Sequence, residues 1–109
     1  MLITEVKQML GQTGLQNTYL AFPEKGAPPL PYLVWYFPET DNFAADDKVY
    51  KRINALNIEL YTANKAFATE QIVEGVLNNW GMVWESNETY LADEKMYEVL
   101  YEMEITIDG

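Results

Sequence analysis

The side chains that could carry chemistry in this sequence are carboxylates, lysines and hydroxyl groups, because its 109 residues include no cysteine and no histidine. This composition excludes a disulfide, a thiolate zinc site, a cysteine nucleophile and the commonest general base. Paired carboxylates could still perform acid–base catalysis if burial made one of them a weaker acid. Glu98, Glu102 and Glu104, however, occupy one row of a strand-like alternation, which favours a solvated acidic face over a catalytic pair.

A second group of carboxylates, Asp41, Asp46 and Asp47, could hold a hard cation through oxygen ligands. The group lacks the spacing of a calcium-binding loop, which places a ligand at every second position and ends with a glutamate. The chain also has no glycine-rich phosphate-binding loop and no nucleophile-elbow motif around a serine. The sequence therefore predicts no metal, no cofactor and no enzymatic activity.

The charge of the chain is strongly negative: seventeen acidic residues against seven basic ones give a formal charge of −10. Such a surface repels phosphate, so specific nucleic-acid binding is not expected, although the charge suits a protein that lies beside DNA or imitates it. The first residues lack a basic region followed by an apolar run, and no segment approaches membrane-spanning length. We expect a soluble protein that is made and used without export and has no membrane partner.

The elements that must position these side chains are clearest between residues 54 and 81. Leu56, Ile58 and Leu60 alternate with polar residues as in a half-buried strand, and apolar positions between Ile72 and Trp80 then recur with a helical period. The remaining pattern predicts a helix at 2–11, strands at 17–22, 31–38, 82–85 and 95–107, and a turn at 86–89. We expect one α+β domain over residues 1–109, with a mostly antiparallel sheet of about four to five strands and two helices packed on one face.

Residues 39–52 are predicted to form a long loop or arm between two strands, and excursions of this size are commonly functional. The aromatic strand before this loop could bury both rows or offer one row to another subunit, since Tyr and Trp are enriched at interfaces. Lys48, Lys51 and Arg52 could pair with an acidic face of a neighbouring copy or be solvated. The candidate interface residues are Trp35, Phe37, Asp41, Asn42, Phe43, Asp46, Asp47, Lys48, Tyr50, Lys51 and Arg52. The candidate acidic face comprises Glu98, Glu102 and Glu104.

Several short segments of the second half carry a resemblance to a known family. They are 41–46 (DNFAAD), 58–62 (IELYT), Lys65, Glu70, 73–74 (VE), Leu77 and 94–102 (EKMYEVLYE). In their order and spacing, over roughly residues 31–105, the chain resembles small proteins of long-tailed phages and prophages: the minor capsid, tail completion or head–tail joining proteins. The resemblance implies a structural part rather than an enzyme, and an α+β fold with helices on a sheet.

Proteins of this kind are similar to tail terminators, which form a ring, commonly a hexamer, at the head-proximal end of the tail tube. The resemblance therefore implies a ring subunit that ends tube polymerisation or joins tail to head, with the tail tube and head connector proteins as partners. Its implied location is the head–tail junction of a virion assembled in the host cytoplasm. A ring requires head-to-tail contacts, for which residues 23–31 and 39–52 are candidate arms, and an acidic bore would repel passing DNA.

Two rival interpretations follow from the charge. An acidic inhibitor or DNA mimic would block a nucleic-acid-binding protein with carboxylates at phosphate-like spacing, but the glutamates here are spread over strand, helix and turn. A small carboxylate-based enzyme would need an enclosed pocket that perturbs two carboxylates.

Overall fold

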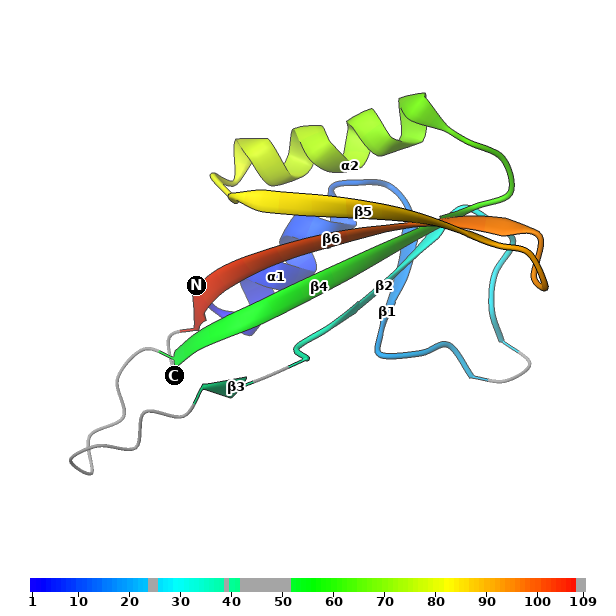
Figure 1. The fold of residues 1–109 in the computed structure, drawn as a ribbon. Coiled ribbons are helices and arrows are strands. Elements are labelled where there is room, and N and C mark those ends of the chain that lie inside the picture. Colours follow the sequence, from blue (N-terminus) through cyan, green and yellow to red (C-terminus); the bar gives the residue numbers. More distant parts are fainter. Residues whose placement is uncertain (24–25, 39, 42–51, 108–109) are drawn as a thin grey trace.

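The computed structural model describes residues 1–23, 26–38, 40–41 and 52–107, with the backbone alone at residues 40, 41, 52 and 53. Figure 1 shows two helices packed on a twisted sheet. The elements in chain order are α1 (Ile3–Gly11), β1 (Gln16–Tyr19), β2 (Tyr32–Tyr36), β3 (Thr40–Asp41), β4 (Arg52–Thr62), α2 (Phe67–Asn79), β5 (Trp84–Leu91) and β6 (Met96–Ile107).

Five strands follow one path across the sheet in the order β1-β2-β4-β6-β5, and the two-residue β3 pairs with β4. Only β1 and β2 run parallel; the other described pairs are antiparallel. The longest pairing joins β4 to β6, from Arg52 opposite Ile107 to Thr62 opposite Tyr97. The predicted α+β fold with a mostly antiparallel sheet is therefore confirmed.

The hydrophobic core lies between one face of this sheet and both helices. The alternation predicted for β4 is confirmed, because Leu56, Ile58 and Leu60 are all fully buried. Opposite them on β6 lie Met103, Tyr101 and Val99, which share the core. The helices add Val6, Met9, Leu10, Val73 and Leu77 to the same cluster. Both described helices therefore pack on one face, as predicted, and neither of them covers the other face of the sheet.

The predicted turn at residues 86–89 is wrong. These residues belong to β5, which continues to Leu91, and the turn follows at residues 92–95. β5 is an edge strand whose residues 85–90 are all exposed, so no buried row interrupts its polar sequence. A strand that is solvated on both faces lacks the alternation by which strands are recognised.

The first predicted strand is also shorter than expected, since β1 ends at Tyr19 rather than at Phe22. The loop predicted at 39–52 lies mostly outside the described residues, apart from the backbone of β3 and the first residue of β4. No helix among the described residues is both long enough and apolar enough to cross a membrane.

Candidate assembly surface

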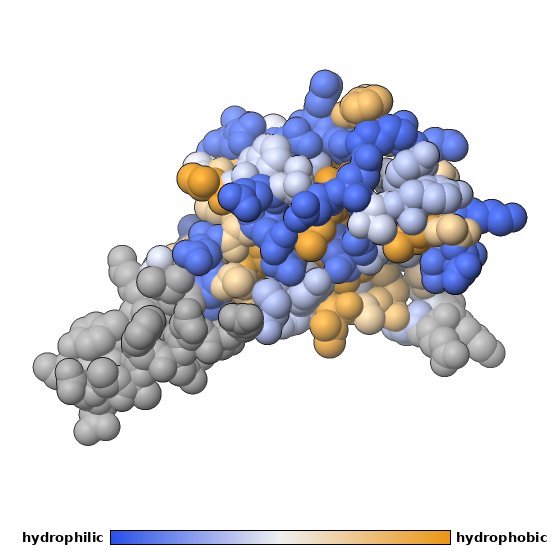
Figure 2. Space-filling model, viewed as in Figure 1, coloured by the Kyte–Doolittle hydropathy of each residue, from blue (hydrophilic) through white to orange (hydrophobic). Residues whose placement is uncertain are grey.

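The sheet face that points away from the helices is strongly acidic, and we call it the open face. Parity and strand register place five glutamates on it: Glu59, Glu85, Glu98, Glu102 and Glu104. Figure 1 shows β4 and β6 in front of α1, and the same view in Figure 2 shows hydrophilic side chains across the centre of this side. The three glutamates proposed from the sequence therefore share one surface with two others.

Tyrosine hydroxyls hold the carboxylates at the centre of the open face. The Tyr36 hydroxyl donates to Glu59 Oε2 at 2.8 Å. The Tyr61 hydroxyl lies 2.7 Å from Glu59 Oε1 and 2.9 Å from Glu98 Oε2, and its one hydrogen serves one carboxylate at a time. Burial raises the pKa of Tyr61, and the two neighbouring carboxylates raise this pKa further. The hydroxyls therefore stay protonated and act as donors to the glutamates.

Positive charge does not balance these glutamates in the described part of the open face. No described strand position on this face carries a basic residue. Lys65, between β4 and α2, instead pairs with Glu70 at 2.7 Å and with Glu88. Glu85 and Glu102 lie directly opposite each other on β5 and β6, where like charges repel. The open face is therefore an uncompensated acidic surface, held in shape by neutral hydrogen-bond donors.

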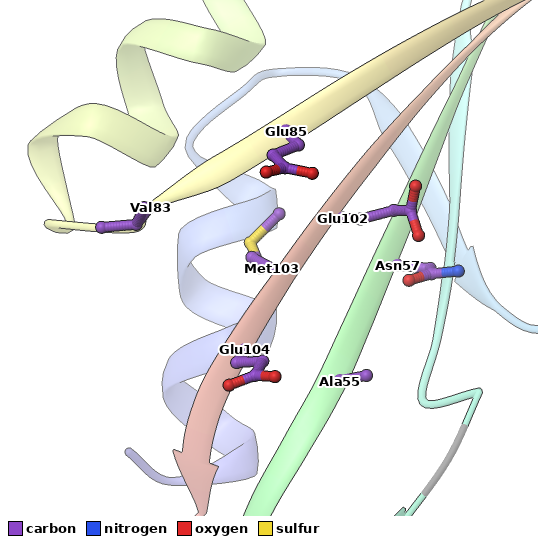
Figure 3. Close-up of a pocket in the computed structure, with 7 residues that line it drawn as sticks. All are labelled: Ala55, Asn57, Val83, Glu85, Glu102, Met103 and Glu104. Carbon is purple, nitrogen blue, oxygen red and sulfur yellow. The ribbon is translucent and has the colours of Figure 1, made fainter.

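A hollow of about 560 Å³ lies at one end of the open face. Figure 3 shows Glu85, Glu102 and Glu104 around it, together with Asn57, Ala55, Met103 and Val83. The three carboxylates are exposed to solvent, so the hollow does not enclose a pair of buried acids. In the described part of the chain no group of three acidic side chains is arranged to hold a metal ion.

Two of the residues proposed from the sequence as interface residues have described side chains. Trp35 is 3% exposed and lies in the core, where its ring is 4.9 Å from that of Tyr19 and 6.0 Å from that of Phe37. Phe37 is half-buried and Tyr19 is 44% exposed, so the aromatic group reaches the surface through these neighbours. The side chains of Asp41, Asn42, Phe43, Asp46, Asp47, Lys48, Tyr50, Lys51 and Arg52 lie outside the described residues. Their interface role stays a prediction.

The alternation of β4 predicts that Glu59 and Tyr61 lie on the row directed away from the core, and the structure places them there. The open-face residues that the sequence did not identify are Glu85 and Tyr36, whose hydroxyl donates to Glu59. The direction of Glu85 was not predictable, because the register of β5 depends on the turn at 92–95, which was predicted at 86–89 instead.

Comparison with solved structures finds a chain of similar fold. This chain is similar to a chain in a structure of the virion of a native gene transfer agent particle, with a TM-score of 0.63 and 14% sequence identity. The match covers 93% of this chain and 84% of that chain. At this identity the likeness establishes a shared fold. No protein-family model matches the sequence, and no curated protein matches it.

Proposed function

We propose that this protein is a structural component of a phage-like virion, and more specifically a ring subunit at the head-proximal end of a tail. There it would end tube polymerisation or join the tail to the head. The observation that carries the proposal is the fold shared, over 93% of the chain, with a component of a gene transfer agent virion. The family resemblance of residues 31–105 supports the more specific role. Its partners would be further copies of itself, the tail tube protein and the head connector.

The open face supports a position beside DNA without binding it. In a ring, five glutamates from each copy would face the bore and repel the phosphate backbone. At physiological ionic strength charges are screened beyond about 8 Å. The repulsion therefore acts only near the wall, where it prevents DNA from adhering. The tyrosine bonds to Glu59 and Glu98 would keep part of this wall in a fixed arrangement.

The proposal is tested by disrupting the reading frame in the phage or prophage that carries it and examining the lysate by negative-stain electron microscopy. We expect full heads beside detached or overlong tails, and rescue when the intact gene is supplied in trans. Normal infectious particles would contradict the structural role.

The acidic wall is tested by reversing two exposed glutamates of the open face, Glu85→Lys and Glu102→Lys, in the complementing copy. The matched control reverses Asp93 and Glu94, which are exposed in the turn at 92–95 and lie off the sheet. We expect particles to assemble in both cases and DNA ejection to fall only in the first. Equal ejection by both variants would contradict a bore-lining role for the open face.

The uncompensated charge of the open face also favours a second candidate function, an acidic inhibitor that occupies the nucleic-acid site of a basic protein. Such a complex would weaken steeply as salt is raised, because its contacts are between opposite charges. Ring assembly through apolar contacts would change little. Association measured at low and high salt therefore separates the two candidates.

A further inference from the structure

The chain leaves β1 in a conformation that leucine rarely adopts. Leu20 has a φ of 70°, and the N–H of Ala21 donates to the carbonyl of Tyr19 at 2.8 Å. A positive φ beneath a hydrogen bond between residues i and i+2 is the strained form of the γ-turn. Glycine would form this turn without a steric penalty. The presence of leucine at this strained position suggests that its side chain has a function.

That side chain is exposed beyond the end of the edge strand β1, where Leu20 also lines a hollow of about 290 Å³ that includes Tyr32, Val34 and Glu59. Leu20 is 67% exposed, although its N–H donates to the Trp35 carbonyl of β2 at 2.8 Å and so fixes the turn to the sheet. Its neighbour Tyr19 is 44% exposed. The surrounding sequence contains no Asp, Glu, Lys or Arg at residues 8–23 or 26–38. In a chain of charge −10, these uncharged residues add no repulsion when an acidic copy approaches them.

The opposite edge of the sheet carries a complementary feature. Val83, just before β5, is 86% exposed. Beside it is a hollow of about 300 Å³, lined by the apolar residues Met82, Val83 and Ile105 together with Met1, Gly81, Glu104 and Thr106. β2 and β4 lie between β1 and the strand β6 that lines this hollow, so Leu20 cannot enter the hollow of its own chain.

The strand register gives the relative positions of Leu20 and Val83 along the strand direction. One row crosses the sheet from edge to edge through Tyr19, Trp35, Ile58, Tyr101 and Ser86. Leu20 lies one residue beyond this row, and Val83 lies three residues beyond it at the same end. The offset of two residues is about 7 Å. Copies in a closed ring are related by rotation without rise, so contacting features must match in height along the axis. An axis parallel to the strands would leave the offset of about 7 Å, so the strands must be inclined to the ring axis to bring the two features level.

We propose that Leu20 of one copy packs into the hollow beside Val83 of the next copy, and that this head-to-tail contact closes the ring. The inference deepens the proposed function and rests on it. A symmetric contact between two β5 edges is disfavoured, because it brings together the Glu85 side chains of two acidic edges. A symmetric contact between two β1 edges would stop at a dimer and leave both hollows empty.

Cysteine cross-linking tests the contact directly, since the chain has no cysteine of its own. The variants are Leu20→Cys, Val83→Cys and the two combined, each treated with a short bismaleimide as purified protein and in particles made with the variant gene. We expect the double variant to give a ladder of linked oligomers, and a mixture of the single variants to give one linked pair. Each single variant alone should yield at least tenfold less product.

A matched control places the second cysteine at Ile72 on α2, which is 52% exposed and lies away from both edges. Leu20→Cys combined with Ile72→Cys should give at least tenfold less ladder. As a second measurement, Leu20→Gly relieves the backbone strain and so retains the fold, but it should weaken self-association at least tenfold by light scattering.

The outcomes separate this contact from the proposed function. Rings or normal particles without a ladder, or an equal ladder with Ile72→Cys, would overturn the contact and leave the virion role standing. A specific ladder from a protein whose loss does not affect particles would support the contact and overturn the virion role. Strong linking of either single variant to itself would indicate a symmetric dimer and would also overturn the proposal.

Discussion

Replacing Tyr101 by phenylalanine removes one oxygen atom from the junction between the sheet and α2. Tyr101 is fully buried, and its ring meets that of Trp84 edge-on at 5.3 Å. Its hydroxyl donates to Glu74 Oε2 on α2 at 2.8 Å. Burial raises the pKa of this hydroxyl, and the bond to the Glu74 carboxylate raises the pKa further. The substitution therefore tests one charge-assisted hydrogen bond while the ring packing is retained.

The expected loss of stability follows from the surroundings of that bond. Hydrogen bonds to charged groups contribute about 1.5–3 kcal/mol to the free energy of unfolding. Glu74 is half-buried, so water can solvate its carboxylate after the hydroxyl is lost, and we expect the lower end, about 1.5 kcal/mol. For a chain of this length the melting temperature should fall by roughly 5–9 °C.

Urea and thermal unfolding followed by circular dichroism would measure the change. The matched control is Tyr90→Phe, which makes the same substitution at a ring that is 52% exposed and whose hydroxyl makes no hydrogen bond among the described residues. The control should change stability by less than about 0.5 kcal/mol. A double-mutant cycle with Glu74→Ala should give a coupling of about 1 kcal/mol. A Tyr101→Phe loss no larger than that of the control would refute the reasoning.

Three further predictions follow from other parts of the structure. Because the folded chain raises the pKa of Tyr61 and Tyr101 above the ordinary 10.0, the unfolded chain releases these protons first as the pH rises. The stability that these groups contribute is fully present below pH 10.0. Above this pH it should fall by up to about 1.4 kcal/mol per pH unit for each tyrosine. A free energy of unfolding in urea that stays constant above pH 10.0 would contradict the proposal that both hydroxyls are buried hydrogen-bond donors. Glu85→Gln should raise the free energy of unfolding by roughly 0.2–1 kcal/mol by removing repulsion with Glu102; a gain that persists at about 1 M salt would contradict its electrostatic origin. Leu20→Gly should leave the monomer equally stable or up to about 1 kcal/mol more stable in thermal unfolding, because relief of strain offsets the flexibility of glycine; a clear loss would show that Leu20 is not strained.

The sequence predicted those parts of the fold where burial imposes a period. The central residues of one row of β4 lie in the core, so Leu56, Ile58 and Leu60 had to alternate with polar residues. The edge strand β5 has no such requirement, and its polar residues 86–89 resemble a turn. The parallel pairing of β1 with β2 was also not predictable, because it depends on the course of the connection between them rather than on either strand.

The candidate site was predictable to a similar extent. The row formed by Glu98, Glu102 and Glu104 follows from strand parity alone. Its extension to Glu85 needs the register between two strands, which turn geometry sets. The exposed Leu20 could not be predicted, because positive φ is expected of glycine or asparagine and a leucine in a short strand is normally assigned to the core.

The two surfaces of the proposal are compatible only because the fold separates them. If the open face lines a bore, the helices must lie outside and the two sheet edges must meet neighbouring copies, which is where Leu20 and Val83 lie. Mutual repulsion of the acidic faces opposes ring closure, and an uncharged edge lets the copies approach despite it. The acidic face would then determine how the ring treats DNA, while the edges determine whether the ring forms. Substitutions at Glu102 and at Leu20 should for this reason act independently, one on DNA passage and the other on assembly.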